Sequence, residues 1–372
     1  MRGGGTPRRS TPEFYGGSIP WVTPKDMKQA VIDDSSVRLT QAGMDSSPAK
    51  LIAPGSVLVV VRSGVLKHTL PVALTTAPVT VNQDMKALTP SDEVHPAFLA
   101  RLIKSLQPLV LSWVRATTAD NFPIENLLDL DVQIPPLSEQ RRIAAILDQA
   151  DALRAKRRRI LTLVDALPQS IFDDLFGSEI WNSTIGEIAS VQTGPFGSLL
   201  HKEDYVSGGV SVINPMHIRN GQLQPDVEFS VTESKAASLS LYRLQEGDVV
   251  LGRRGEMGRA GVVGAQHVGM LCGTGSLILR PRDVDSRFLH SVVTSPRMKA
   301  HLERSSLGAT LPNLNATIVR TSPAPRAPDQ AQAQFAEALR AVDGSRSATR
   351  RAAIKNDELF ASLQSRAFRG EL

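Results

Sequence analysis

Few of this chain's side chains stand in the patterns that catalysis requires. No G-x-x-x-x-G-K-[ST] loop is present, so the sequence gives no support to nucleotide-driven motor work. The stretch "CGTGSL" at 272–277 has only part of a dinucleotide fingerprint and is most simply a turn between strands. The seven histidines are dispersed and Cys272 is the only cysteine, so no metal site is readable. We therefore expect no metal, no cofactor and no catalytic residue on this chain.

Two further stretches could do chemistry, but a structural explanation is favoured for both. The stretch "NPMH" at 214–217 is weakly similar to an adenine-methylase loop, but an aromatic residue is absent from it. Asp226, Glu233 and Lys235 stand in the order of a metal-nuclease set. Acidic and basic clusters of this kind are common on protein surfaces, so this order alone does not indicate a nuclease.

The residues best suited to bind a ligand are the arginines of a glycine-spaced loop, "RRGEMGRAG" at 253–261. Glycines let a backbone approach a DNA duplex, and arginines bind phosphates or guanine edges. Arg62 occupies the matching place in the first half of the chain. The alternative for each is a solvated hairpin arginine. The predicted DNA contacts are Arg62, Lys25, Lys67, Arg253, Arg254, Arg259, Lys202, Arg219 and Asn313, followed by Arg8 and Arg9. Trp21 and Phe196 are expected in the core.

Composition sets the broad class of the protein. The formal net charge of +5 and the pI of about 9.5 permit an anionic partner but do not prove one. A single cysteine excludes an intrachain disulfide and favours a reducing, cytoplasmic compartment. No apolar run approaches the roughly 20 residues of a membrane helix. The opening "MRGGGTPRRS" lacks the apolar region of a signal peptide.

The chain repeats itself at a shift of 192 residues. Between positions 140 and 176 this shift gives 11 identities over 37 ungapped positions. "PGSVL" at 54–58 falls on "EGDVV" at 246–250, and Arg62 falls on Arg254. The sequence therefore predicts a tandem pair, each a strand-rich domain of about 140 residues followed by a long helix. The second domain opens with "WNSTIGEIASVQTG" at 181–194, which has no counterpart in the first. We expect either a start further upstream or another segment that completes the first domain.

Each domain is expected to have a mixed α/β (α+β) fold. Short β-rich runs such as "SVLVVVR" at 56–62 and "GSLILR" at 275–280 are punctuated by Gly, Pro, Asn and Asp. Helical patterns follow at 96–106 and 286–303. The predicted organisation is a first strand-rich domain at 1–135, a central helix at 136–177, a second strand-rich domain at 178–327 and a C-terminal helix at 328–372.

The two long helices are predicted to pair as an antiparallel coiled coil. Apolar residues recur at a spacing of three and four over several turns, which forms a seam for another helix. Pro168 is expected to kink or split the first helix, and Gly344 weakens the second by about 1 kcal/mol. The residues expected in the seam or in subunit docking are Ile143, Leu147, Leu153, Ile160, Val164, Phe335, Leu339, Leu359 and Leu363.

The stretch "IPPLSEQRRIAAILDQADALRAKR" closes a strand-rich domain, and its pattern returns near the C-terminus with "LQSRAFRGEL". With "GDVVLGRRGEMGRAGVV" at 247–263 and "GATLPNLN" at 308–315, the chain resembles type I restriction–modification specificity subunits. The resemblance implies two target-recognition domains that each read half of a bipartite DNA site, held apart by the helix pair. It implies docking of adenine-methyltransferase subunits that use S-adenosylmethionine, and of a motor and nuclease subunit where the system cuts DNA.

Two other functions compete with this resemblance. A coiled-coil scaffold for protein interactions, without sequence-specific DNA binding, is the runner-up, and a self-contained nuclease or methyltransferase is more distant. The basic run at 156–159 is either a solvated helix face or part of a docking surface. The second helix lacks the Glu-Gln start of the family, since Gln332 and Gln334 stand where the first copy has Gln140 and Arg142.

Overall fold

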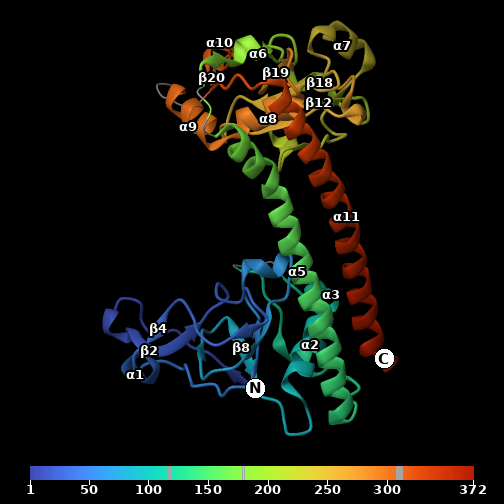
Figure 1. The fold of residues 1–372 in the computed structure, drawn as a ribbon. Coiled ribbons are helices and arrows are strands. Elements are labelled where there is room, and N and C mark those ends of the chain that lie inside the picture. The colour runs from blue at the N-terminus through green and yellow to red at the C-terminus, as the bar shows by residue number, and fades with distance from the viewer. Residues whose placement is uncertain (116–118, 178, 180, 307–312) are drawn as a thin grey trace. The chain divides into compact units, whose positions relative to one another are not determined.

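The computed structural model describes residues 1–115, 119–177, 179, 181–306 and 313–372. These residues form two compact units. Unit 1 contains residues 1–158 and 351–372, and unit 2 contains residues 159–350. The division falls inside the two long helices, α5 (Leu137–Phe176) and α11 (Asp329–Ala367), so each helix contributes to both units (Figure 1).

Unit 1 is built around a five-stranded sheet in the order β1-β8-β5-β6-β3. Its central strand β5 has the sequence VLVV, and all four side chains are buried. Leu58 and Val60 pack into one apolar cluster, while Val57 and Val59 pack into another on the opposite face. Burial of both faces explains why this run is continuously apolar rather than alternating. The strands are β1 (Arg2–Gly3), β3 (Val31–Ile32), β5 (Val57–Val60), β6 (Val72–Thr75) and β8 (Met85–Leu88).

A second, three-stranded sheet in unit 1 holds Trp21. The indole is buried, and its Nε1 donates to the carbonyl of Gly5 at 2.9 Å, which confirms the prediction that Trp21 belongs to the core. The strands are β2 (Tyr15–Val22), β4 (Arg38–Leu39) and β7 (Thr80–Val81). The helices of this unit are α1 (Gln41–Asp45), α2 (Pro96–Ser105), α3 (Gln107–Ser112) and α4 (Ile124–Leu128).

Unit 2 contains two four-stranded sheets and two short ladders. The first sheet has the order β10-β19-β16-β17 and the second β11-β15-β12-β18. Their strands are β10 (Ala189–Thr193), β19 (Ser276–Pro281), β16 (Val249–Gly252), β17 (Ala260–Val262), β11 (Tyr205–Val206), β15 (Ser230–Val231), β12 (Val210–Ile213) and β18 (Leu271–Cys272). The short ladders join β13 (Ile218–Arg219) to β14 (Gln222–Leu223) and β9 (Ser183–Thr184) to β20 (Pro323–Ala324).

The helical pattern predicted at 286–303 is divided in two. Ser295 is extended and precedes Pro296, which has no N–H to continue a helix, so one helix ends and the next begins there. The Ser295 side chain caps the new helix by accepting from the N–H of Met298. The helices of unit 2 are α6 (Ile185–Ile188), α7 (Glu233–Ser238), α8 (Ser286–Thr294), α9 (Pro296–Ser305) and α10 (Ala316–Thr321).

The predicted repeat is visible in the strand register. Trp21 pairs with Thr80 in a parallel ladder, and Val212 pairs with Leu271 in another, with both partners shifted by 191 residues. The central strands β5 and β16 each lie between two antiparallel neighbours. The two units therefore share one plan, as the tandem interpretation predicts.

Gln140 and Gln332 make similar contacts in the two units. The Gln140 amide accepts from the N–H of His95 at 2.7 Å and donates to the carbonyls of Glu93 and Pro135. Gln332 accepts from the N–H of Asp285 and donates to the carbonyl of Ala327. Each buried amide thus ties the start of a long helix to the segment that leads into α2 or α8.

The two units share an equivalent ion pair between α5 and α11. In unit 1, Nε of Arg154 lies 2.6 Å from Oδ1 of Asp357. In unit 2, Nε of Arg346 lies 2.8 Å from Oδ1 of Asp165. The residues correspond at the shift of 192, so the pairs are the two copies of one antiparallel contact. This contact supports the predicted antiparallel helix pair.

The apolar seam differs in part from the prediction. Ile143, Leu147, Val164, Phe335 and Leu339 are buried and Leu363 is half-buried, as expected for seam residues.

Leu153, Ile160 and Leu359 are not buried in a seam, because their side chains are 57, 41 and 53% exposed, and their alternative role in subunit docking stays a prediction. In unit 1 the neighbouring Arg154 lies on the side of α5 that contacts α11, with its guanidinium 4.2 Å from the centre of the Phe360 ring. Splitting of α5 at Pro168 is also wrong, since one helix spans the proline. Among the described residues, no helix is both long and apolar enough to span a membrane.

Candidate nucleic-acid interface

One end of the central sheet of unit 1 brings several predicted site residues together. The chain leaves β5 after Val60, which pairs with Met85 at the start of β8. The N–H of Phe122 donates to the carbonyl of Val61, which pins the segment before α4 to the same place. We call this end of the sheet the sheet-end surface of unit 1; it carries Arg62, Lys67, Asp84 and Asn121.

Unit 2 has an equivalent sheet-end surface. Gly252, the last residue of β16, pairs with Ser276 at the start of β19. The N–H of Leu314 donates to the carbonyl of Arg253 at 2.9 Å, which repeats the Phe122–Val61 contact 192 residues further on. Isolated bridges join Arg62 to Asn121 and Arg254 to Asn313. The surface of unit 2 therefore carries Arg253, Arg254, Gly275 and Asn313.

The equivalent arginines have different surroundings. Arg62 forms an ion pair with Asp84, whose Oδ1 lies 2.5 Å from Nη2 of the arginine. Arg254 is exposed, and its side chain makes no ion pair or hydrogen bond within the described residues. The two sheet-end surfaces thus share a backbone framework but present different charge patterns.

Arg253 is half-buried, and its guanidinium donates to the protein's own backbone, while its contact with DNA stays a prediction. Nε donates to the carbonyl of Leu314 at 2.8 Å, and Nη1 lies 3.4 Å from the carbonyl of Thr274. Burial, with the neighbouring charge of Arg254, holds the pKa of Arg253 below its ordinary value. Arg253 therefore secures the 313–314 segment on which the interface depends.

The remaining predicted contacts lie at several places. Lys67 is exposed, with Nζ 3.9 Å from Oδ2 of the buried Asp120. Lys202 is exposed at the start of a short 3-10 helix (Lys202–Asp204), and Arg8 and Arg9 are also exposed. Oδ1 of Asn313 is buried and has no hydrogen-bond partner within the described residues. The rest of "GATLPN" at 308–312 lies outside those residues.

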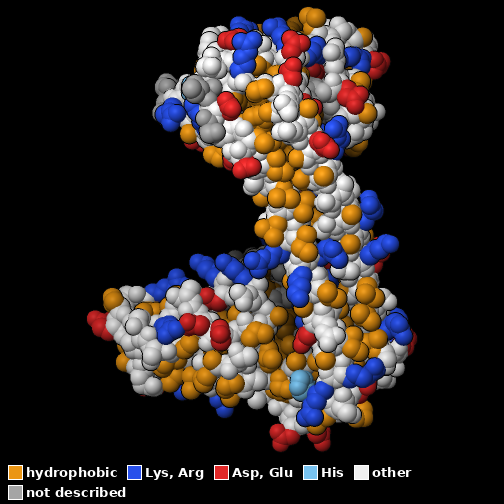
Figure 2. Space-filling view, viewed as in Figure 1, with side chains coloured by type: hydrophobic (Ala, Val, Ile, Leu, Met, Phe, Trp, Pro, Cys, Tyr) orange, Lys and Arg blue, Asp and Glu red, His pale blue; other side chains and the backbone are white. Residues whose placement is uncertain are grey.

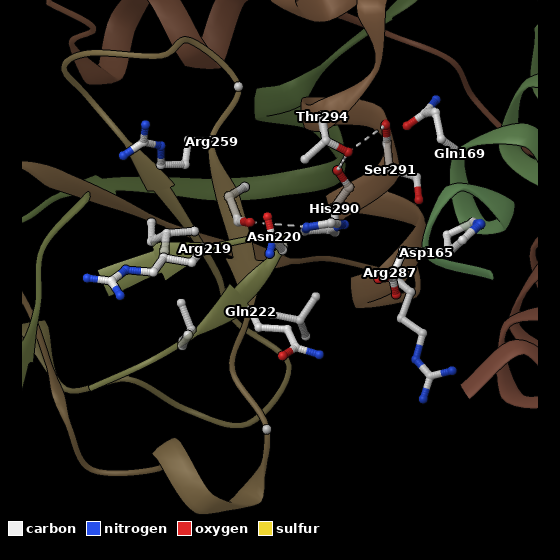
Figure 3. A pocket seen from close by; sticks show the side chains of 18 of the residues that line it. Asp165, Gln169, Arg219, Asn220, Gln222, Arg259, Arg287, His290, Ser291 and Thr294 are labelled. Carbon is white, nitrogen blue, oxygen red and sulfur yellow. Dashed lines mark hydrogen bonds between the residues drawn. The ribbon is translucent and has the colours of Figure 1, made fainter. Parts of the chain in front are cut away.

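A hollow in unit 2 collects two of the predicted cations. It has a volume of about 1160 Å3 and lies between the β13–β14 ladder, α8 and the parts of α5 and α11 that belong to this unit. Figure 3 shows Arg219 and Arg259 on one side of the hollow, and Asp165 and Arg287 on the other. Arg259 also approaches Glu256 at 3.2 Å, so this wall is charged but partly neutralised.

Unit 1 has a hollow of about 840 Å3 in the corresponding place. Lys25 lies on one wall, while Arg101 and Lys104 of α2 and the α5 segment form another. Arg101 is held by Asp148 and Asp151 at 2.7 and 2.9 Å. The structure therefore places Lys25 and Arg219 in hollows of their units, among residues of α2, α5 and α8, and not among the residues that define the sheet-end surfaces.

Lys and Arg side chains gather along one edge of unit 1 in the space-filling view (Figure 2). A positively charged edge attracts the phosphates of nucleic acid, and glycine-rich loops let the backbone come close to them. Such an edge is therefore suited to binding nucleic acid.

The comparison with known families agrees with this geometry. The model of the type I restriction modification DNA specificity domain matches residues 1–163 and 178–356. The chain belongs to this family. Its two matched segments correspond to the two copies of the repeat.

Curated specificity subunits of type I restriction enzymes match parts of the chain. One from Escherichia coli is 36% identical over 172 residues, which is 45% of this chain and 41% of the relative. One from Methanocaldococcus jannaschii is 24% identical over 181 residues, which is 47% of this chain and 41% of that relative. The chain thus matches less than half the length of these two relatives.

Two solved structures share the fold over nearly the whole of this chain. A chain from a study of complex assembly and conformational transition of the type I R-M system has a TM-score of 0.64 at 18% identity. The match covers 99% of this chain and 95% of that one. The S subunit from M. genitalium has a TM-score of 0.55 at 16% identity, over 99% of this chain and 92% of its own.

Two of the residues first considered for catalysis form separate ion pairs in the structure. Glu233 pairs with Arg243, and Lys235 lies 2.9 Å from Asp204, so the nuclease-like set is divided between separate ion pairs. Within the described residues no cluster of His, Cys, Asp or Glu could hold a metal ion. The thiol of Cys272 is buried, and burial raises its pKa.

Two features of the interface were not predicted from the sequence. Asp84 precedes a short strand in "VNQDMKAL", and its contact with Arg62 depends on the pairing of β5 with β8. Phe196 was expected in the core, but its side chain is 64% exposed. It lies in the loop after β10, and the N–H of Gly194 in this loop donates to the carbonyl of Ser276 at the sheet end.

Proposed function

We propose that this chain is the sequence-specific DNA-binding subunit of a type I restriction–modification complex. Each unit reads one half of a bipartite target through its sheet-end surface. The observation that carries the proposal is the repeated surface itself: the same backbone contacts hold Arg62 beside a carboxylate in unit 1 and hold an exposed Arg254 in unit 2. Two readers with one framework and unlike side chains suit two unlike half-sites.

The proposal assigns catalysis to partner subunits. Adenine-methyltransferase subunits dock on this chain and bring S-adenosylmethionine, and a motor and nuclease subunit joins where the system also cuts DNA. The relatives support these partners, since they are named as specificity subunits of type I restriction enzymes. One structural neighbour comes from a study of the assembly of such a system. The chain acts in the cytoplasm, where the target DNA lies.

The first test is selection of DNA by the full chain from a duplex library with a randomised core. The expected product is a motif of two half-sites separated by an unspecified gap. Selection of no motif contradicts the proposal and favours the coiled-coil scaffold. The purified chain should neither methylate nor cut DNA, and either activity from the chain alone would also contradict it.

The second test is Arg254→Ala. Loss of a base contact costs about 1–3 kcal/mol and relaxes one position of one half-site, whereas loss of a phosphate contact weakens binding to all sequences alike. Arg282→Ala is the matched control, because Arg282 is exposed and directly follows β19 at the opposite end of the same sheet. Equal effects of the two substitutions would show that Arg254 contributes charge only.

A further inference from the structure

Asp84 fixes the guanidinium of Arg62 from one side. Its Oδ1 accepts a hydrogen bond from Nε at 2.6 Å and lies 2.5 Å from Nη2 in the same ion pair. Its Oδ2 accepts from Nδ2 of Asn82 at 2.9 Å, and Asn82 is buried. A chain of contacts therefore runs from the core of unit 1 through Asp84 to an arginine whose side chain is 49% exposed.

The contact with Asp84 leaves one edge of Arg62 available. Nη1 makes no hydrogen bond within the described residues, and the second N–H of Nη2 points away from the bonded carboxylate because the guanidinium is planar. Two parallel donors on one edge match the O6 and N7 acceptors of guanine in the major groove. An arginine already held in one orientation loses less conformational entropy when it binds.

The ion pair also changes what Arg62 contributes to unspecific binding. The pair is formally neutral, so it releases few counterions from the phosphate backbone. Unit 2 lacks this arrangement, because Gly275 occupies the place of Asp84. The N–H of Arg253 donates to the Gly275 carbonyl at 2.9 Å just as the N–H of Val61 donates to that of Asp84.

We infer that Asp84 is a positioning residue that makes Arg62 a base-reading rather than a phosphate-binding side chain, with guanine as the base read in the half-site of unit 1. This inference rests on the proposed function. It predicts effects of opposite sign: removal of the carboxylate lowers sequence discrimination while it raises affinity for random DNA.

The test is Asp84→Asn in the full chain, which keeps the side-chain shape and the backbone contacts but removes the charge. Selection from the randomised duplex library should show the preference for guanine at one position of one half-site reduced about tenfold, since a bidentate contact contributes about 1–3 kcal/mol of discrimination. On random duplex DNA, log Kd against log salt should steepen by about 0.9 because one more cation is free. The other half-site should be unchanged.

Two controls separate positioning from a change in charge or folding. Asp34→Asn makes the same charge change and releases Arg38. Asp34 follows β3. Because β3 is parallel to β6 and β6 is antiparallel to β5, β3 ends at the end of the sheet opposite to Arg62. Asp34→Asn should leave both the motif and the salt dependence of random-DNA binding unchanged. In the Arg62→Ala background, Asp84→Asn should no longer change the motif, because its effect acts through the arginine.

The outcomes distinguish this inference from the proposed function. If the wild-type chain selects no motif, both are overturned. If it selects a bipartite motif that Asp84→Asn leaves intact, only the role of Asp84 is overturned. The same holds if the substitution alters the motif equally with and without Arg62, which would indicate a structural effect of Asp84 on unit 1.

Discussion

Gly344→Ala should stabilise unit 2, and the structure allows the size of the effect to be worked out. Gly344 lies within α11 on an exposed face, and a Cβ added there meets no atom within 4 Å. The substitution therefore removes the conformational entropy cost of glycine without a steric penalty, which amounts to about 0.5–1 kcal/mol. In a unit of this size such a gain raises Tm by about 1–4 °C.

Differential scanning calorimetry of the full chain measures this shift, and hydrogen exchange of the α11 amides locates it. The repeat supplies a reverse control: Ala152 occupies the equivalent exposed position in α5, so Ala152→Gly should destabilise unit 1 by a similar amount. An unchanged or lowered Tm for Gly344→Ala would refute the reasoning, since it would mean that α11 is not a regular helix at this residue in solution.

Three further predictions concern single contacts. The Arg154–Asp357 pair should show a coupling of about 0.2–1 kcal/mol in a double-mutant cycle, and the coupling should vanish at about 1 M salt. The hydrogen bond and charge of Arg154 lower the pKa of Asp357, so the pair stabilises unit 1 above the carboxyl's unfolded pKa of about 4. This stabilisation is lost as pH falls through the lower folded pKa. Asp357→Asn should therefore remove this part of the pH dependence of stability, and an unaltered acid profile would contradict the pair. Gln140→Ala should destabilise unit 1 by about 1–3 kcal/mol in urea unfolding, because the N–H of His95 loses its partner. A change under about 0.5 kcal/mol would argue against a stabilising role for this hydrogen bond. Cys272 should react with a thiol reagent only after unfolding, and prompt labelling of the folded chain would contradict its burial.

The repeat was the part of the sequence with the greatest predictive value for both fold and site. A shift of 192 aligned Arg62 with Arg254, and the structure places both at the carboxyl end of an equivalent central strand. The same shift aligned Arg154 with Arg346, although their ion pairs to the opposite helix could not be recognised without the antiparallel arrangement. Self-similarity identifies equivalent positions, but it does not show what each position contacts.

The errors arose where contacts depend on atoms far apart in the sequence. The apolar spacing of α5 is compatible with either of two neighbouring sides of the helix facing α11. In the structure Phe360 packs against the guanidinium of Arg154, and Leu153 is left exposed. Arg253 and Arg254 are adjacent and chemically identical. Only the position of the Leu314 carbonyl decides that the first is held internally while the second is exposed.

The composition of unit 1 has a consequence for its synthesis. Ile143 and Leu147 are buried by Phe360, Leu363 and other residues of the 351–372 segment, and Arg154 meets a partner 203 residues further along the chain. At a translation rate of about 5–20 residues per second, the first helix waits about 10–40 s for this partner. During that time its apolar stripe is open to chaperones and to other nascent chains. Contacts of such long sequence separation also slow the folding of a domain.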